Sequence, residues 1–331
     1  MKADEITERI RRGEVVRDLD LSGQDLSGAD CSRGVLENVV LAGAILHGAN
    51  LQEARLKGCG AASADFRGAR LAGANFKDCR LDGAKFDAVQ GERVEFQDCG
   101  LEGAAFRQAD LRRATFSGCR LAGADFTQAD LARVFLTGED LTGVVFASTN
   151  LRQGYLRGAK AGGQRFPGCD LSLALLEGAD VSGADFSGLD LRQIALSGAK
   201  AGKAVFRQAE AKYARFQDAD CAGADFSGCR FESCDFSGAN LAGARLAGAV
   251  LSMGLFRKAD LGRADFSRSK LDYADFSHAR TSGAVFRDAD LSMANMHRVL
   301  LNSADTAGAE MGGVRATDKD LAEAEAWTPK G

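Results

Sequence analysis

The chain carries a large apolar residue at every fifth position from Val16 to Met311, without one shift in register. Of the 60 positions in this series, 51 are Leu, Phe, Val or Met. The nine exceptions are mostly small residues: Cys31, Ala61, Gly91, Ala161, Ala201, Ala211, Cys221, Thr281 and Thr306. A small residue, usually Ala or Cys, stands two positions before each large one. Such a fixed repeat constrains the fold strongly, because each unit completes its core with its neighbours alone.

A period of five excludes the α-helix. In a helix, five residues turn the chain by roughly 500°, about 140° beyond a full turn, which would scatter the large residues around the axis. In an extended chain, residues two apart share a side, so the small and the large residue of each pentad face inward together. Each following pentad must turn a corner, and four corners close one coil. Glycines such as Gly23, Gly28, Gly43 and Gly48 suit corners that need a positive φ.

Columns taken every twenty residues support a coil of four pentads. One column holds nine consecutive phenylalanines: Phe66, Phe86, Phe106, Phe126, Phe146, Phe166, Phe186, Phe206 and Phe226. A column half a coil away holds Phe76, Phe96, Phe116, Phe216, Phe236, Phe256 and Phe276. The two remaining columns are mainly leucine. We therefore expect phenylalanines to stack on opposite walls with leucines between them.

The pentads also carry a recognisable motif, as in Ala49-Asn50-Leu51, Ala64-Asp65-Phe66, Ala129-Asp130-Leu131 and Ala289-Asp290-Leu291. With this motif the chain resembles the pentapeptide-repeat family, A-[DN]-[LF]-x-x, over residues 16–315. The resemblance implies an all-β fold, a right-handed quadrilateral parallel β-helix. About 15 coils spaced by about 4.8 Å would build the solenoid.

The two ends of the chain lack the repeat and are expected to form short helical caps, because an open coil leaves backbone groups unpaired. Residues 1–15 should hold an N-terminal capping helix with Ile6 and Ile10 on one side. Residues 316–331 should hold a C-terminal capping helix and tail, with Thr317 as N-cap. Trp327 is expected to fold onto the last coil. Both a monomer and a dimer through a capped end remain open.

Targeting signals are not visible in the sequence. No run of 18 apolar residues predicts a membrane span, and the first 15 residues lack the apolar centre of a signal peptide. Nine cysteines without an export signal favour a reducing compartment. These features predict a cytoplasmic protein.

Candidate chemistry is sparse, and we expect no catalytic residue, cofactor or metal. Four cysteines recur every twenty residues, at Cys59, Cys79, Cys99 and Cys119, in the inward position that is usually Ala. Zinc needs ligands that converge from several directions, which collinear thiols do not offer, so we interpret them as packing residues. His278 and His297 lie near Ser277 and Asp275 in the coil, but an outward β-surface supplies no oxyanion hole. The sequence therefore predicts a protein that is not an enzyme.

Charge is spread evenly over the predicted coil. On each of the four walls, the numbers of basic and acidic residues differ by one, and the whole chain has a formal net charge of −4. No wall forms an acidic stripe of the kind a DNA mimic needs, and no basic wall favours direct nucleic-acid binding. The unbroken register also leaves no loop protruding from the coils.

One edge of the predicted solenoid stands out. Large apolar residues occupy outward positions of one column and of its neighbour across a corner: Leu173, Tyr213, Met253, Tyr273 and Met293, and Phe135, Tyr155, Leu175 and Leu255. In the coils that precede Leu173, the first column holds three arginines: Arg93, Arg113 and Arg133. Aromatic residues, Met and Arg are enriched where proteins bind one another. Cross-strand stacking that only stabilises neighbouring coils is the alternative interpretation.

The sequence thus favours a non-enzymatic scaffold that binds a protein partner of unknown identity along this edge. Resemblance alone adds two narrower functions. Long, loop-free members of the family look like bacterial accessory proteins of type VI secretion clusters. Other members are thought to mimic DNA and to protect topoisomerases such as gyrase.

Overall fold

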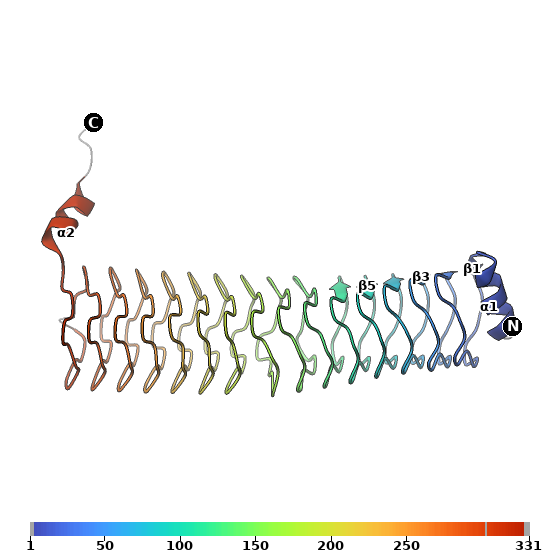
Figure 1. Cartoon of the computed structure of the whole chain (residues 1–331), viewed down its shortest axis with the longest axis horizontal. Coiled ribbons are helices and arrows are strands. Elements are labelled where there is room, and N and C mark those ends of the chain that lie inside the picture. Colours follow the sequence, from blue (N-terminus) through green and yellow to red (C-terminus); the bar gives the residue numbers. More distant parts are fainter. Residues whose placement is uncertain (1–2, 302, 328–331) are drawn as a thin grey trace. The chain divides into compact units, whose positions relative to one another are not determined.

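The computed structural model describes residues 3–301 and 303–327. The chain divides into two compact units, Met1–Leu175 (unit 1) and Leu176–Gly331 (unit 2). In each unit the chain winds in successive coils that lie side by side (Figure 1). Residues 328–331 of the expected tail lie outside the described part.

Unit 1 contains the regular strands. They form one parallel sheet in sequence order: β1 (Val16–Arg17), β2 (Val35–Glu37), β3 (Arg55–Lys57), β4 (Asn75–Lys77), β5 (Glu95–Gln97) and β6 (Thr115–Ser117). Every pair has a register of twenty residues, as in Leu36 opposite Leu56. The other walls pair through single bridges with the same offset, such as Asp25 with Ile45. Unit 2 is built from such bridges, among them Asp225 with Arg245. The predicted parallel β-solenoid with a short helix at each end is thereby confirmed.

Backbone hydrogen bonds link each coil to the coils before and after it. The N–H of Leu46 donates to Asp65 O at 2.7 Å, and the N–H of Asp65 donates back to Ala44 O at 2.9 Å. Corners are made by residues with positive φ, for which glycine is best suited. Gly23 and Gly28 have φ of 62° and 66°, as the sequence predicts.

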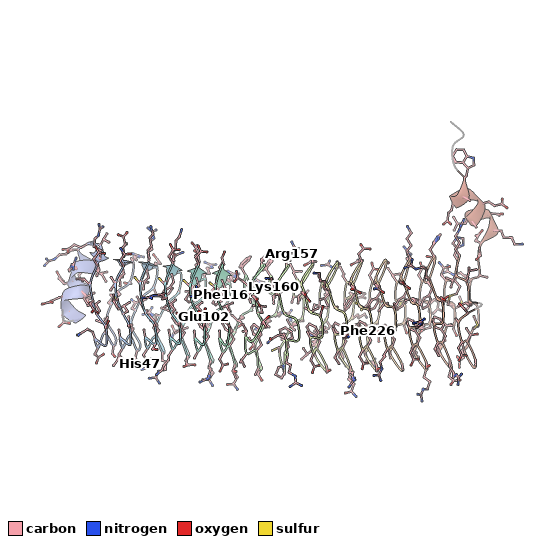
Figure 2. The ribbon with its side chains drawn as sticks, turned by 180° about the vertical axis from the view of Figure 1, so that it is seen from behind. His47, Glu102, Phe116, Arg157, Lys160 and Phe226 are labelled. Atoms are coloured by element: carbon pink, nitrogen blue, oxygen red, sulfur yellow. The ribbon has the colours of Figure 1, made fainter. Side chains whose placement is uncertain are left out.

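The core consists of stacked rings. In unit 1, Phe66 and Phe86 stack with centroids 4.8 Å apart and planes within 4°. Phe66 also meets Phe76 of the other phenylalanine column edge-on at 6.1 Å. Both geometries are favourable for aromatic pairs. Unit 2 repeats the arrangement, and Phe116 of unit 1 and Phe226 of unit 2 both lie inside their coils (Figure 2).

Helix α1 (Ala3–Arg11) lies at the first coil of unit 1 (Figure 1). Ile6 and Ile10 are buried, as predicted. The coil makes room for the helix, because a Cβ on Gly34 would come within 3.0 Å of Ile10 Cδ1. The N-terminal end of unit 1 is therefore covered by apolar contacts.

Helix α2 (Lys319–Ala326) corrects two expectations in unit 2. Asp318 is its N-cap, with a side-chain oxygen that accepts from the N–H of Leu321, whereas Thr317 Oγ1 accepts from the N–H of Arg298. Trp327 remains 71% exposed and does not fold onto the last coil, and α2 buries none of its side chains. The helix contributes too few apolar side chains on one face to cover the coil.

One coil of unit 1 departs from the repeat. Phe126 and Phe146 are 5.7 Å apart, and Phe146 and Phe166 are 5.8 Å apart, instead of the 4.8 Å found between Phe106 and Phe126. Two polar residues in normally small inward positions flank this coil. Glu139 accepts from the N–H of Gly118 at 2.7 Å, and Gln164 donates to Val144 O at 2.6 Å. These side chains take the place of ladder bonds, so the coils there are spread apart.

The stacked core yields a stability prediction. Phe106→Ala should lower the free energy of unfolding by about 3–5 kcal/mol, because the fully buried ring leaves a cavity that neighbouring rings cannot fill. Urea unfolding followed by circular dichroism measures the loss. Phe135→Ala, which removes an exposed ring, is the matched control and should cost less than about 1 kcal/mol. Equal losses for the two variants would contradict the stacked core.

Candidate interaction edges and a C-terminal histidine cluster

The predicted edge residues of unit 1 form a continuous surface, which we name the unit 1 edge: Phe135, Tyr155, Leu173 and Leu175. The rings of Phe135 and Tyr155 stack with centroids 4.5 Å apart and planes within 4°. Both rings are more than one third exposed, and the two leucines are half-buried. A hollow of about 360 Å³ lies beside Tyr155 and both leucines. The stack therefore presents apolar surface to solvent.

Three predicted arginines, Arg93, Arg113 and Arg133, form the arginine column beside this edge. Together with Glu95, Thr115 and the stacked pair they line a second hollow of about 390 Å³. Glu92 lies 4.0 Å from Arg93 and 3.9 Å from Arg113, whereas Arg133 donates to the neutral side chain of Gln153 at 2.7 Å. In these contacts, the positive charge of Arg133 is therefore not neutralised by a carboxylate.

Unit 2 carries the second set of predicted residues, which we name the unit 2 edge: Tyr213, Met253, Leu255, Tyr273 and Met293. Tyr213 and Met253 are each 53% exposed, Tyr273 is 59% exposed and Met293 43%, while Leu255 is half-buried. The ammonium group of Lys212 lies 5.2 Å from the centre of the Tyr213 ring, which is a cation–π contact. These side chains receive little cover from the rest of unit 2.

The backbone at these edges is unusual for such large side chains. Tyr213, Met253, Tyr273 and Met293 have φ between 58° and 61°, and Leu173 of unit 1 has 62°. This left-handed region costs an L-residue about 1–2 kcal/mol relative to the right-handed helical one. Other corners of this kind carry Gly or polar residues in most cases. The Tyr and Met residues at these corners thus oppose the preference of the backbone and remain exposed.

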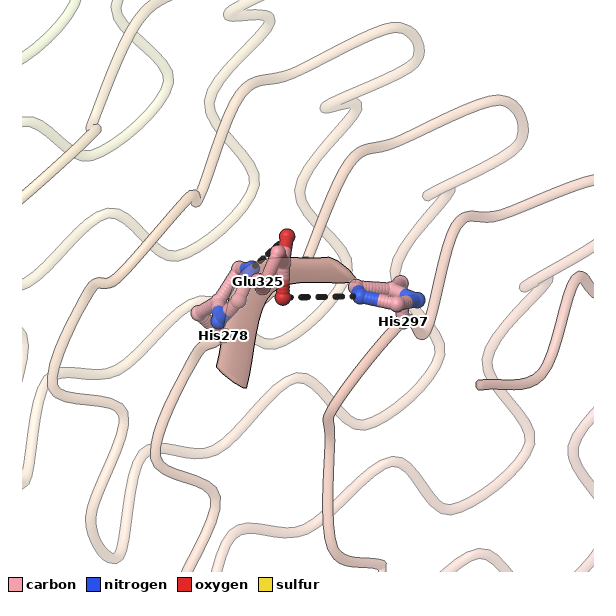
Figure 3. Close-up of side chains that lie close together, drawn as sticks. All are labelled: His278, His297 and Glu325. Carbon is pink, nitrogen blue, oxygen red and sulfur yellow. Dashed lines mark hydrogen bonds and ion pairs between the residues drawn. The ribbon is translucent and has the colours of Figure 1, made fainter. Parts of the chain in front are cut away.

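Sequence reasoning missed a cluster at the C-terminal end of unit 2. His278 and His297 stand on neighbouring coils, and Glu325 of α2 lies between them (Figure 3). Nε2 of His278 lies 3.2 Å from one carboxylate oxygen of Glu325, and Nε2 of His297 lies 3.4 Å from the other. Arg298 adds an ion pair at 2.7 Å. A hollow of about 540 Å³ adjoins the cluster.

Two histidines and a glutamate are a common zinc set, and their ligand atoms lie within 4.8 Å of one another. The hydrogen bonds favour another role. The N–H of Asp318 donates to Nδ1 of His297 at 3.1 Å, so the proton of the neutral ring is on Nε2, the atom a metal would need. Nε2–H can then donate to Glu325. We interpret the cluster as the polar attachment of α2, because the helix buries no side chain of its own.

The pKa of Glu325 reflects this attachment. Partial loss of water around the carboxylate acts to raise its pKa, but the hydrogen bond from His297 and the charges of His278 and Arg298 outweigh it. The pKa of Glu325 therefore lies below its ordinary value of 4.5. The ionised form is the one that holds the helix.

The sequence analysis also missed a neighbour of the inner column of cysteines. Cys59, Cys79, Cys99 and Cys119 are all buried in consecutive coils, as expected. The next position of the same column is Glu139, a buried carboxylate whose pKa is raised by burial, although N–H donors of Gly118 and Cys119 oppose that shift. A search of the small inward positions for Glu and Gln would have found it.

No helix among the described residues is long and apolar enough to cross a membrane. The sequence matches the family model described as "Pentapeptide repeat region" over residues 29–106 and 109–186. A second model, "Pentapeptide repeats (8 copies)", matches residues 190–220, 214–252 and 255–280. Both matches confirm the resemblance that the motifs indicate.

Solved structures give distant matches, and no curated protein matches the sequence. Full-length QnrB1, a plasmid-mediated fluoroquinolone resistance protein, is 18% identical over 93% of this chain and 95% of its own, with a TM-score of 0.23. HetL, involved in heterocyst differentiation regulation in the cyanobacterium Nostoc sp. strain PCC 7120, is 20% identical over 96% of each chain, with a TM-score of 0.19. A pentapeptide repeat protein of the Arabidopsis thaliana thylakoid lumen is 27% identical over 38% of this chain and 70% of its own, with a TM-score of 0.16. Similarity at this level says nothing about function.

The attachment of α2 can be tested with Glu325→Gln. The variant removes the charge that His278, His297 and Arg298 share, and a helix of eight residues is unstable on its own. We expect amide-exchange protection of α2 to fall about tenfold or more, with the coils unchanged. Glu323→Gln removes the same charge from the same helix and should leave protection intact. Loss of protection in both variants would argue against the cluster.

The pH dependence of the attachment follows from the lowered pKa of Glu325. A carboxylate with a lowered pKa stabilises the attached state above its ordinary value of 4.5, and this contribution is lost as the pH falls through the lowered value. Amide exchange of α2, corrected for its intrinsic pH dependence, should therefore differ between wild type and Glu325→Gln at neutral pH. The difference should vanish in acid. A difference that grows on acidification would be contrary to this assignment.

Proposed function

Because the chain belongs to the pentapeptide-repeat family, we propose that it is a non-enzymatic scaffold that binds a protein partner along its unit 1 and unit 2 edges. The single observation that carries this proposal is the set of exposed Tyr and Met side chains on left-handed backbone, Tyr213, Met253, Tyr273 and Met293. Strain that the surrounding packing does not need is a reason to look for function. The exposed side chains are of the types that dominate binding energy at protein interfaces.

The mechanism is preorganisation. The coils hold edge residues such as Tyr155, Tyr213 and Tyr273 in place through backbone ladders, so little conformational freedom is lost when a partner docks. In unit 1 the stacked pair Phe135 and Tyr155 offers a flat apolar face, and Arg133 next to it offers a charged donor fork. A partner that inserts an apolar side chain and a carboxylate would use both.

Two narrower functions remain as separate proposals. An accessory role in type VI secretion is supported only by resemblance, and neighbouring genes for spike or sheath components would test it. Topoisomerase protection is the alternative function. It requires acidic stripes that the balanced walls do not supply. A gyrase supercoiling assay with and without the purified protein separates this alternative from the scaffold, since a scaffold for another partner leaves supercoiling unchanged.

Glycine substitutions test the unit 2 edge while sparing the fold. We expect the combined variant Tyr213→Gly, Met253→Gly and Tyr273→Gly to keep its unfolding midpoint, because glycine relieves the left-handed backbone. Partner capture in affinity purification with quantitative mass spectrometry should fall at least about tenfold.

The matched control changes three exposed left-handed corners on another wall of unit 2: Gln208→Gly, Arg268→Gly and Asp288→Gly. It should retain every protein that the wild type captures. A partner bound equally by the wild type and both variants would show that unit 2 does not use this edge.

A further inference from the structure

The thiol column of unit 1 comprises four cysteines in equivalent positions of consecutive coils. Each Sγ donates to the carbonyl of the residue 23 positions earlier: Cys59 to Leu36 at 3.5 Å, Cys79 to Leu56 at 3.4 Å, Cys99 to Phe76 at 3.3 Å and Cys119 to Phe96 at 3.3 Å. The shared hydrogen-bond pattern gives the four thiols one orientation. Successive sulfurs are therefore separated by the coil repeat.

The distances between stacked rings measure the coil repeat in this region. Phe66 and Phe86, and Phe86 and Phe106, both stand 4.8 Å apart. A metal–thiolate bond is roughly 2.3 Å long, so a metal with two thiolates in a straight line spans roughly 4.6 Å. Sulfur atoms arranged in a line cannot bind zinc tetrahedrally. They can bind an ion that takes two ligands in a linear geometry. Soft metals are the ones that thiolates select.

The surroundings fix the charge of the ion. The core around these thiols is buried and apolar, and an isolated charge there is costly. Two thiols and a divalent ion give a neutral product: two S–H bonds break, two metal–sulfur bonds form, and two protons leave to solvent without a change in oxidation state. A monovalent ion between the same thiolates would leave one negative charge in the core.

A second observation points to a cation at one end of the column. Glu139 stands one coil beyond Cys119 and is 7% exposed, and its carboxylate accepts from the backbone N–H groups of Gly118 and Cys119 rather than from a basic side chain. Cys119 is also 7% exposed, whereas Cys59, Cys79 and Cys99 are at most 1% exposed. The next coil is spread to 5.7 Å. Access to the column is thus easiest beside a negative group.

We propose that the thiol column Cys59, Cys79, Cys99 and Cys119 is a binding site for soft divalent ions of Hg²⁺ type, each held linearly between two successive thiolates, with Glu139 at its mouth. Four thiols in two pairs hold two ions. The site lies inside unit 1 and is independent of the interaction edges.

The test uses Hg²⁺ on the reduced full-length chain, in a parent variant with only these four thiols: Cys31→Ala, Cys169→Ala, Cys221→Ala, Cys229→Ala and Cys234→Ala. Alanine is already the commonest residue at most of these positions, and circular dichroism checks the fold. The adjacent-pair variant adds Cys59→Ala and Cys79→Ala and keeps two thiols on neighbouring coils. The separated-pair variant adds Cys79→Ala and Cys119→Ala and keeps two thiols with a coil between them.

The parent should bind two Hg²⁺ by native mass spectrometry. The adjacent pair should bind one ion with two sulfurs at roughly 2.3 Å by X-ray absorption, and it should resist competing glutathione at least tenfold better than the separated pair. Equal coordination and retention in the two variants, or a parent that binds no ion, would overturn the site. Glu139→Gln should slow loading about tenfold without changing the stoichiometry, and unchanged loading would remove Glu139 from the site.

If the parent does not fold, the same comparison is made in the otherwise native chain. Cys99→Ala breaks one of the two pairs and should cost one ion held by two sulfurs. Cys169→Ala removes an isolated buried thiol and should cost none. Equal losses in these two variants would overturn the proposal.

Discussion

The ladder of backbone hydrogen bonds that pairs residues twenty apart as bridge partners is the constraint on which every other feature depends. It places equivalent side chains of consecutive coils directly above one another, as with Phe76 and Phe96. Because the vertical repeat is close to the stacking distance of aromatic rings, a column of one residue type packs well without any variation. The same repeat produces the phenylalanine stacks inside, the Phe135–Tyr155 stack outside and the thiol column. These three features therefore have the same cause, the vertical repeat of the coils, and differ only in the pentad position that they occupy.

The fold was largely predictable, since each pentad needs only its neighbours. The five-residue period located the inward positions, and Gly23 and Gly28 marked corners that do take positive φ. What failed were local exceptions. Thr317 and Asp318 both offer a side-chain oxygen that could cap the helix. Thr317 accepts from the N–H of Arg298 instead, so Asp318 is the N-cap. Trp327 stays exposed because α2 is held by charges rather than by apolar packing.

The candidate sites also contain some residues that the repeat predicts and others that it does not. Edge residues could be assigned to columns from the sequence, because an outward position is outward in every coil. The left-handed backbone of Leu173, Tyr213, Met253, Tyr273 and Met293 could be foreseen as well, since they hold the same pentad position as the corner glycines Gly23 and Gly28. Glu139 and the pairing of His278 with Glu325 were missed. The first replaces backbone bonds by a side chain, and the second joins a coil to a helix 47 residues away, so neither follows from the repeat.

Function and fold are separated in this chain to an unusual degree. Apart from the thiol column, the interior is committed to packing, and the outer walls carry balanced charge that neither attracts nor repels a polyelectrolyte strongly. Specific recognition then depends on the few outward positions that hold a large apolar side chain where the other coils mostly have glycine or a polar residue. Tyr213 and Tyr273 in unit 2, and Tyr155 in unit 1, are such positions. We regard this contrast, rather than any pocket, as the best guide to how the protein works.

The twenty-residue register can be measured directly by nuclear Overhauser effects between backbone protons in a deuterated, amide-protonated sample. Asp65 and Lys85, and Asp225 and Arg245, are bridge partners within unit 1 and unit 2 respectively. The account predicts contacts at this one separation along each unit, from wall to wall. Contacts at any other fixed separation, or an absence of contacts between coils, would contradict it.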